Sequence, residues 1–458
     1  MPSALNAPPA NPAGPLRGRF GRTLLAVAAF ALPALSLGAP SGYSWGALLL
    51  VMAGLSAWGL ARPSQTSCRA LAAFAVATGI MAVVWFLRHD FDAAHPWQPA
   101  AFEHAAKYLV ALLAIPALCR FAPPLPSILW GCWVGAWLAG GIAAWQVFVL
   151  GLPRAHGFTN AIPFGNIALL LAAWSAIGWP LARSRAQRLA LVLAVAMGMF
   201  ASLASGSRGG WVIAPALLAI VWLTQPKRAA GPEPGAAQPT LSWRTTARPR
   251  TLAGLALILG LLLSTQWAQI TTRLGEIDQE VAAYFERGEA DTSIGQRLAH
   301  WQLAWQLGLE KPWLGWGKAG YEAEKNRRVA AGDAPTILLD FGNAHHEWLD
   351  LWAKGGLVGV AALAAFYGVP GWLYWRARRR AAAQLRNGPD PRGTVCWLAA
   401  SCGLVTVVGF LGFGLTHKLL TYNASNIVYL FMNLLWLGVI AHTATPRRIE
   451  GGCRQDTI

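Results

Sequence analysis

Apolar residues occur along the chain in runs of about 20 residues, separated by mostly short polar segments. A run of this length, wound as an α-helix, matches the roughly 30 Å hydrocarbon core of a bilayer, and it is too long and too unpatterned for a barrel strand. The pattern predicts an all-α polytopic membrane protein with about twelve transmembrane helices. They are expected at about 23–40, 43–61, 68–87, 104–121, 126–150, 164–182, 186–204, 209–225, 251–270, 347–375, 394–416 and 424–443.

Two longer polar segments interrupt these runs. Residues 226–250 are basic and rich in Pro and Gly, which predicts a linker without a fold of its own. Residues 271–346 carry helical patterning in 271–287 and 294–309, followed by a turn at 311–317. We expect this segment to be a helical subdomain that packs on the membrane surface, because it is small for an independent core.

The apolar runs and polar segments together divide the chain into seven parts. These are a disordered tail at 1–22, helices one to eight within 23–225, the linker at 226–250, helix nine at 251–270, the subdomain at 271–346, helices ten to twelve within 347–443, and a tail at 444–458.

Charge gives this topology an orientation. With both termini in the cytoplasm, the cytoplasmic segments hold 23 of the 37 Lys and Arg but only 4 of the 20 Asp and Glu. This asymmetry follows the positive-inside rule. The basic clusters are therefore interpreted as anchors against anionic membrane lipid, and the formal charge of +17 does not indicate a nucleic-acid partner. The subdomain at 271–346 is expected in the periplasm.

Composition excludes several other classes. Only 12% of the residues are charged, whereas a soluble domain carries roughly 25%. The six cysteines include no CxxC pair and none lies in a long polar loop, so neither a disulfide framework nor a zinc site is predicted. No cofactor is indicated.

Four polar motifs fall on the periplasmic side of this topology. Arginine dominates the first three, and its planar guanidinium suits two-point contacts to phosphate. Arg208 also has glycine neighbours, which permit close approach of a ligand, and it opens a helix whose N-terminus is positive. The motifs contain Arg154 and Asn160, then Ser207, Arg208, Gly209 and Gly210, then Arg297, and finally His345, His346, Glu347 and Asp350.

The two adjacent histidines allow more than one interpretation. His346 and Glu347 lack a second histidine four residues further on, so the HExxH zinc pattern fails and no metal is predicted. A helix-capping histidine and a general base remain open. Arginines that hold a diphosphate leaving group, together with a histidine that takes a hydroxyl proton, favour glycosyl transfer from a lipid diphosphate donor.

A twelve-helix transporter or flippase is the alternative from another class. Such proteins often show two similar halves and charged or broken helices near the membrane midplane. The sequence has no visible internal repeat, and its apolar runs are nearly free of ionisable residues at their centres. Polar residues gather at one face instead, which favours catalysis at the membrane surface.

The motifs resemble those of the O-antigen ligase/polymerase superfamily of bacterial inner-membrane proteins. The resemblance covers roughly residues 150–370 and rests on Ser207-Arg208-Gly209-Gly210, on Arg154…Gly157…Asn160, and on His345-x-x-x-Leu349 with Gly355-Gly356-Leu357-Val358-Gly359. It implies a metal-independent, inverting glycosyltransferase of the GT-C kind, with an undecaprenyl diphosphate-linked glycan as donor. By this resemblance Arg154, Arg208 and Arg297 contact the diphosphate. A histidine activates the acceptor hydroxyl: the register favours His345, and His346, which stands where the family commonly has Asn, is the second candidate.

Three activities within this superfamily look alike: lipopolysaccharide O-antigen ligase, O-antigen polymerase and protein O-oligosaccharyltransferase. A single large periplasmic loop between helices nine and ten favours the ligase or the protein transferase. The short tail after helix twelve disfavours the protein transferase. The expected activity is therefore the ligase, with the lipid A-core oligosaccharide as acceptor.

Overall fold

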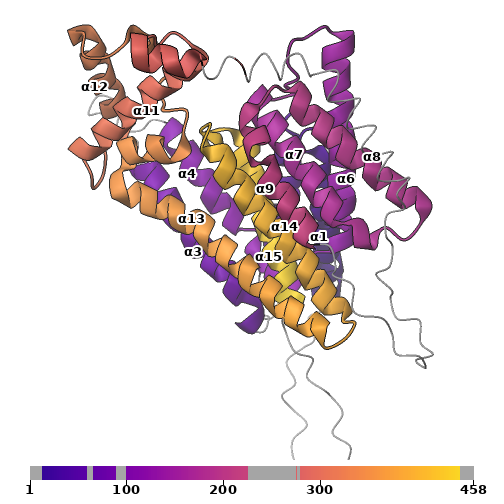
Figure 1. The fold of residues 1–458 in the computed structure, drawn as a ribbon. Helices are drawn as coiled ribbons and strands as arrows, with labels where there is room; N and C mark the ends of the chain where they lie inside the picture. Colours follow the sequence, from indigo (N-terminus) through magenta and orange to yellow (C-terminus); the bar gives the residue numbers. More distant parts are fainter. Residues whose placement is uncertain (1–12, 59–64, 89–98, 225–274, 276–278, 444–458) are drawn as a thin grey trace, which may run out of the picture.

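The computed structural model describes residues 13–58, 65–88, 99–224, 275 and 279–443, and every regular element in this part of the chain is helical (Figure 1). The helices of the bundle are α1 (Ala13–Leu35), α2 (Gly42–Ala57), α3 (Gln65–Leu87), α4 (Pro99–Leu112), α5 (Ile115–Arg120), α6 (Leu125–Ala144) with the π-helical turn η1 (Trp145–Val149), α7 (Ala161–Ile177) with η2 (Trp179–Leu181), α8 (Arg185–Ala204), α9 (Arg208–Thr224), α13 (Glu347–Arg386), α14 (Pro391–Gly414), η4 (Leu419–Thr421) and α15 (Asn423–Thr443).

Eight helical segments in the described part of the chain are long and apolar enough to cross a membrane. Three further apolar helices, at 42–57, 161–177 and 209–224, are shorter. The prediction of an all-helical polytopic membrane protein is confirmed in this form. The expected ninth helix at 251–270, the linker at 226–250 and the C-terminal tail at 444–458 lie outside the described residues.

Two expected boundaries differ from the structure. α1 begins at Ala13 rather than at residue 23, so residues 13–22 are helical and not a disordered tail. Pro15 falls among the first four residues of α1, whose N–H groups have no partner within a helix, so it does not prevent the helix from beginning before its apolar run. The run at 104–121 is divided into α4 and α5 by a turn at residues 113–114.

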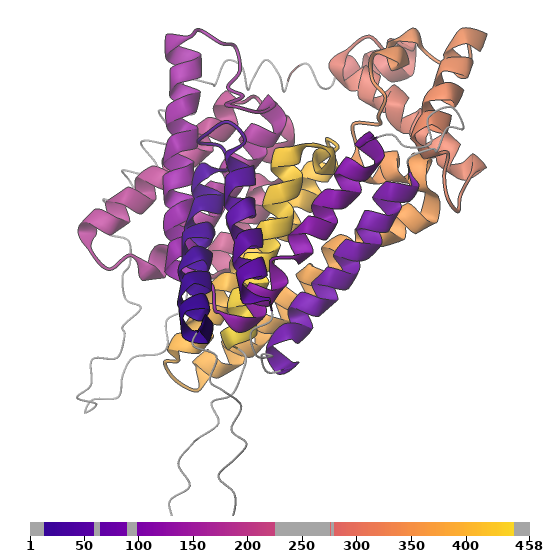
Figure 2. The same cartoon turned by 180° about the vertical axis from the view of Figure 1, so that it is seen from behind.

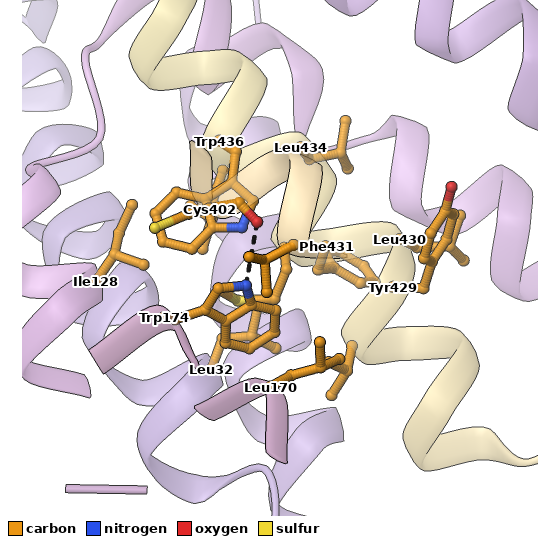
Figure 3. Packing of buried hydrophobic residues seen from close by; sticks show 14 of the residues in the cluster. Leu32, Ile128, Leu170, Trp174, Cys402, Tyr429, Leu430, Phe431, Leu434 and Trp436 are labelled. Atoms are coloured by element: carbon orange, nitrogen blue, oxygen red, sulfur yellow. Dashed lines mark hydrogen bonds between the residues drawn. The ribbon is translucent and has the colours of Figure 1, made fainter. Parts of the chain in front are cut away.

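The core of the bundle is built around α15, which contacts helices from both ends of the chain. Trp174 of α7 and Trp436 of α15 lie edge to face, with their ring centroids 6.1 Å apart. The indole N–H of Trp174 donates to the carbonyl of Cys402 in α14 at 3.1 Å (Figure 3). This buried bond satisfies the indole inside an apolar core and joins α7 to α14.

The long helix α13 is interrupted at Gly356, whose φ of +58° and ψ of −157° are not helical. The N–H groups freed by this kink donate to the turn after α11: Leu357 to the carbonyl of Pro312 at 2.7 Å and Val358 to that of Trp313 at 3.2 Å. A Cβ on Gly356 would lie 2.4 Å from the carbonyl carbon of Trp313. The glycine in the Gly-Gly-Leu-Val-Gly run therefore permits the turn to dock into the kink.

The polar segment before α13 forms a helical subdomain at one end of the bundle (Figures 1 and 2). It contains helical residues 279–287, α11 (Ser293–Glu310), α12 (Gly317–Ala331) and η3 (Thr336–Asp340). It has a small apolar core of its own, which includes Leu303, Leu307, Tyr321 and Leu338 and extends to Ala353 of α13. The subdomain is thus seated on the first turns of α13.

One cysteine pair differs from the expectation. Cys68 of α3 and Cys119 of α5 form a disulfide, with their Cα atoms 5.3 Å apart. No sequence pattern marks this pair, because only the packing of α3 beside α5 brings two residues 51 positions apart together.

Candidate active site

The turn at residues 341–346 connects η3 to α13 and carries both candidate histidines. His345 has a left-handed backbone with φ of +49°, which costs a non-glycine residue on the order of 1–3 kcal/mol. Its N–H donates to Oδ1 of Asn343 at 3.0 Å. The N–H of Ala344 donates to Oδ1 of Asp350 at 3.3 Å. These two hydrogen bonds therefore hold His345 in this conformation.

His346 acts as the N-cap of α13. Its Nδ1 accepts a hydrogen bond from the N–H of Leu349 at 3.3 Å. Its ring lies edge to face with Trp301, at a centroid distance of 5.4 Å. Burial lowers the pKa of His346, which keeps the ring neutral and able to accept the capping bond. The geometry thus matches the capping interpretation for His346.

The imidazole of His345 faces His417, which lies in the loop between α14 and α15. The two Nδ1 atoms are 3.4 Å apart, and Nε2 of His417 lies 2.9 Å from the hydroxyl of Tyr422. Nε2 of His345 is buried and has no hydrogen-bond partner within the described residues. If Nδ1 of His345 carries the proton and donates to His417, then Nε2 of His345 is left with an unshared lone pair.

Electrostatics keep these rings neutral. Burial lowers the pKa of His345 to about 4, and the positive charge of Arg297 acts in the same direction. Burial also lowers the pKa of His417 to about 3, with a smaller contribution from His345. A neutral imidazole is the form that can accept a proton, so His345 has the protonation state that a general base needs near neutral pH.

A cavity of about 320 Å³ borders His345. Its lining combines the loop before α7, the start of α11, the histidine turn and the α14–α15 loop. The lining residues are Asn160, Ile162, Ser293, Gln296, Arg297, Phe341, Asn343, His345, His417, Lys418, Thr421 and Tyr422. We call it the histidine cavity.

A second cavity, of about 490 Å³, borders Arg154. Ser207, Gly209 and Arg297 also line it, together with Thr416 and His417 of the loop after α14. We call it the arginine cavity. Arg297 and His417 contribute to the walls of both cavities, so the two spaces adjoin.

Arg154 is positioned by the turn between α8 and α9. Its Nε donates to the carbonyl of Ser205 at 2.7 Å, and the N–H of Ala155 donates to that of Ala204 at 2.9 Å. Ser207 is fixed from the other side, because its hydroxyl donates to Oδ1 of Asn166 at 3.1 Å. These bonds join the loop before α7 to the turn that precedes Arg208.

Arg208 is the first residue of α9, and the structure describes its backbone only. The glycines after it are closely packed: a Cβ on Gly209 would lie 2.0 Å from Oγ1 of Thr416, and one on Gly210 would lie 3.1 Å from Oδ1 of Asn166. These glycines therefore admit neighbouring side chains, where the sequence suggested the approach of a ligand.

Asp350 is the centre of a buried ionic cluster and is 1% exposed. Its carboxylate lies 3.1 Å from Nη2 of Arg88, 2.6 Å from Nζ of Lys354 and 2.9 Å from Nζ of Lys418. Lys354 also donates to the carbonyl of Gly342 at 2.7 Å. The cluster joins α3, α13, the α14–α15 loop and the histidine turn.

Glu347 is also buried, and its Oε2 accepts the N–H of Leu420 at 3.0 Å. Among the hydrogen bonds of the described residues, neither Glu347 nor Asp350 reaches the ring of His345. Asp350 binds the backbone beside His345, at Ala344, and Glu347 binds the backbone of the α14–α15 loop, at Leu420. The described residues contain no group of three or more His, Cys, Asp and Glu that could hold a metal ion.

Four residues of this region carry no recognisable sequence motif and were not expected at the site. Arg88 directly follows α3, and His417, Lys418 and Tyr422 lie in the short loop between α14 and α15. The charge-based topology assigns both places to the same side as the four motifs, which is the signal that could have drawn attention to them. No motif marks them, because they join the site only through the packing of the helices.

These features define a polytopic helical membrane protein with a polar site, lined by arginine and histidine, at one end of its bundle. Residues 189–364 match the family model for O-antigen ligase. This match supports membership of the O-antigen ligase superfamily, which the motifs of the sequence also indicated. The family match suggests a glycosyl-transferring enzyme, and proteins of this family are associated with lipid-linked glycans at a membrane.

A relative shares much of the chain. An uncharacterized protein of Haemophilus influenzae is 24% identical over 328 residues, which is 69% of this chain and 75% of that protein. The family match includes Arg208, Arg297 and His345, whereas Arg154 and His417 lie outside it.

Proposed function

We propose that this protein transfers O-antigen polysaccharide from undecaprenyl diphosphate to the lipid A-core oligosaccharide. The observation that carries the proposal is the pair of adjoining cavities. The arginine cavity offers Arg154 and Arg297 to a diphosphate, and the histidine cavity offers the buried, unpartnered Nε2 of His345 to an acceptor hydroxyl. A donor and an acceptor bound in neighbouring spaces can be held in reacting geometry.

In the proposed reaction Nε2 of His345 accepts the proton of the acceptor hydroxyl. The hydroxyl oxygen bonds to the anomeric carbon of the glycan while the bond from that carbon to the diphosphate oxygen breaks. Undecaprenyl diphosphate leaves with the bonding electron pair, and attack from the opposite side inverts the anomeric carbon. Arg154, Arg208 and Arg297 stabilise the negative charge of the leaving group, a role for which no metal is required.

Two contacts support His345 as the base in this scheme. The hydrogen bond between the Nδ1 atoms of His345 and His417 orients the imidazole of His345, and the hydrogen bond to Tyr422 in turn orients His417. Arg297 lowers the pKa of His345 in the free protein. A bound diphosphate offsets the positive charge of Arg297, so donor binding raises the basicity of His345 at the moment when a base is needed.

The proposed setting is the bacterial inner membrane, with the site in the periplasm and both termini in the cytoplasm. Twelve transmembrane helices of the GT-C kind, with residues 251–270 as the ninth, complete this topology. It is supported by the charge asymmetry of the sequence and by the meeting of residues from four separate segments at the two cavities.

The experiment that tests the function supplies purified protein with a lipid-linked glycan and three acceptors in parallel: core lipid A, a second lipid-linked repeat, and a peptide containing Ser and Thr. We expect product with core lipid A, its loss in His345→Ala, and its retention in His346→Ala as the matched control. Product only with the second repeat would assign the chain as an O-antigen polymerase, and product only with the peptide as a protein O-oligosaccharyltransferase. Full activity in His345→Ala would refute the base, and activity that vanishes with EDTA and returns with zinc would refute metal independence.

A further inference from the structure

The C-terminal half of α11 and the turn that follows it expose large apolar side chains outside the bundle. Trp305, Leu309, Trp313 and Leu314 are 55%, 57%, 70% and 69% exposed. We call these four residues the apolar edge of the subdomain. The opposite side of α11 is already buried in the core of the subdomain, so this part of the helix is apolar on both sides. Clustered exposed residues of this size mark a binding surface.

Backbone hydrogen bonds fix the position of the apolar edge relative to α13. The kink at Gly356 binds the turn through the two hydrogen bonds to Pro312 and Trp313, and the N–H of Trp316 donates to the carbonyl of Ala353 at 2.9 Å. Leu357 and Val358, at the first turn after the kink, are each 45% exposed. The apolar edge therefore continues directly into the exposed surface of a membrane-crossing helix.

The exposed face of α13 indicates where the hydrocarbon core of the membrane lies along this helix. A stripe of exposed small and apolar residues follows one face of the helix from the kink to its cytoplasmic half: Leu357, Ala361, Ala364, Gly368, Trp372 and Trp375. Arg376 and Arg379 stack on the two tryptophans at its end, at 5.0 and 4.8 Å. Tryptophan with arginine at the end of an apolar stripe is typical of the boundary between hydrocarbon and water.

The length of this stripe places the second boundary between hydrocarbon and water near the apolar edge. Leu357 and Trp375 are 18 residues apart, which is about 27 Å along a helix, and the hydrocarbon core is about 30 Å thick. α13 and the neighbouring α3 are slanted relative to α1 and α6 (Figure 2), and any tilt of α13 against the membrane normal shortens the vertical distance. The first turn after the kink thus lies at or inside the hydrocarbon boundary.

We infer that the apolar edge is inserted into the outer leaflet of the membrane, so that lipid contacts Trp313 and Leu314 at the level of the acyl chains. A glycan platform is the rival partner for exposed tryptophans. Two of the four residues are leucine, which offers no hydrogen bond to sugar hydroxyls, and the polar side chains suited to sugars lie in the histidine cavity instead. Insertion of this edge does not depend on the transfer reaction.

Spin-label accessibility tests the insertion directly. A nitroxide is placed at Leu314→Cys in proteoliposomes, in a chain with Cys453 replaced by Ser, because the remaining cysteines are buried or disulfide-bonded. Ala331→Cys is the matched control, since it is exposed at the end of the charged helix α12. We expect the label at Leu314 to collide mainly with oxygen, which concentrates in lipid, and the label at Ala331 to collide mainly with water-soluble nickel chelate.

Each other outcome overturns the inference. Equal access of nickel chelate to both labels means that the edge lies in water, and protection of Leu314 only after glycan addition means that the edge binds sugar. A label that neither reagent reaches means that a second copy of the chain covers the edge. If Leu314→Cys does not fold, Leu309→Cys and Trp313→Cys report on the same surface, with the Trp313 label expected deeper than the Leu309 label.

Discussion

The kink in α13 can be tested by replacing Gly356 with alanine. An L-residue at φ +58° and ψ −157° occupies a region that is almost confined to glycine, which costs on the order of 1–3 kcal/mol. The new Cβ would also lie 2.4 Å from the carbonyl carbon of Trp313. The turn must therefore move away, and the hydrogen bonds from Leu357 and Val358, worth about 1 kcal/mol each, are lost or stretched. Gly356→Ala should lower the free energy of unfolding by about 3–5 kcal/mol.

The matched control lies in the same helix. Gly368 has helical backbone angles, and apart from the adjoining backbone of α13 no described atom lies within 4 Å of the position that a Cβ would take. Gly368→Ala should leave stability unchanged or raise it by up to about 1 kcal/mol, because alanine favours a helix.

Both variants are compared by unfolding in mixed micelles with rising dodecyl sulfate, followed by circular dichroism. Chymotrypsin, which cuts after Trp and Leu, reports on local release of the turn at 311–316. We expect faster cleavage there in Gly356→Ala alone. If the two variants unfold alike and are cleaved alike, the kink does not hold the subdomain, and the argument for a fixed apolar edge fails with it.

Three further predictions concern the site. Asp350→Asn leaves three cations without their buried carboxylate and should cost about 3–5 kcal/mol of stability, whereas adding Lys418→Met should recover part of that loss; equal stability of the single and double variants would contradict the ionic cluster. Arg297→Gln should raise the pKa of His345 from about 4. The acid limb of the kcat/KM profile, where the base is protonated as pH falls, should then move to higher pH. An unmoved limb would show that the charge of Arg297 does not influence the base. His346→Ala removes a helix cap and should cost about 1 kcal/mol of stability while turnover persists, and loss of turnover in a stable variant would make His346 the base.

The sequence predicted the helical class of the fold because a run of about 20 apolar residues has few alternatives to a membrane helix. It also predicted the helix at 294–309, where α11 lies, from periodicity alone. The sequence did not predict the kink at Gly356, because the apolar pattern at 347–375 indicates one uninterrupted helix. Only the docking of the turn at 312–313 shows why the glycines are there.

The sequence indicated the candidate site as a set of four motifs that the charge-based topology assigns to one side of the membrane. Residue type alone could not distinguish His345 from His346, because capping and proton transfer favour the same residue type, and only the register of the family resemblance favoured His345. The structure distinguishes them: His346 caps α13 through the N–H of Leu349, and His345 lines the histidine cavity. Arg88 and His417 were missed because each is a single polar residue at a helix end, and only tertiary packing brings them to the site.

The residues of the site come from distant segments of the chain, and this affects what recombination between relatives can achieve. Arg297 and His345 lie in the segment shared with the family, but Arg88 precedes that segment and His417 and Lys418 follow it. A hybrid that exchanges only α11 to α13 would set a foreign histidine turn against the resident α3 and the resident α14–α15 loop. Acceptor preference should therefore pass from one relative to another only when these distant segments are inherited together.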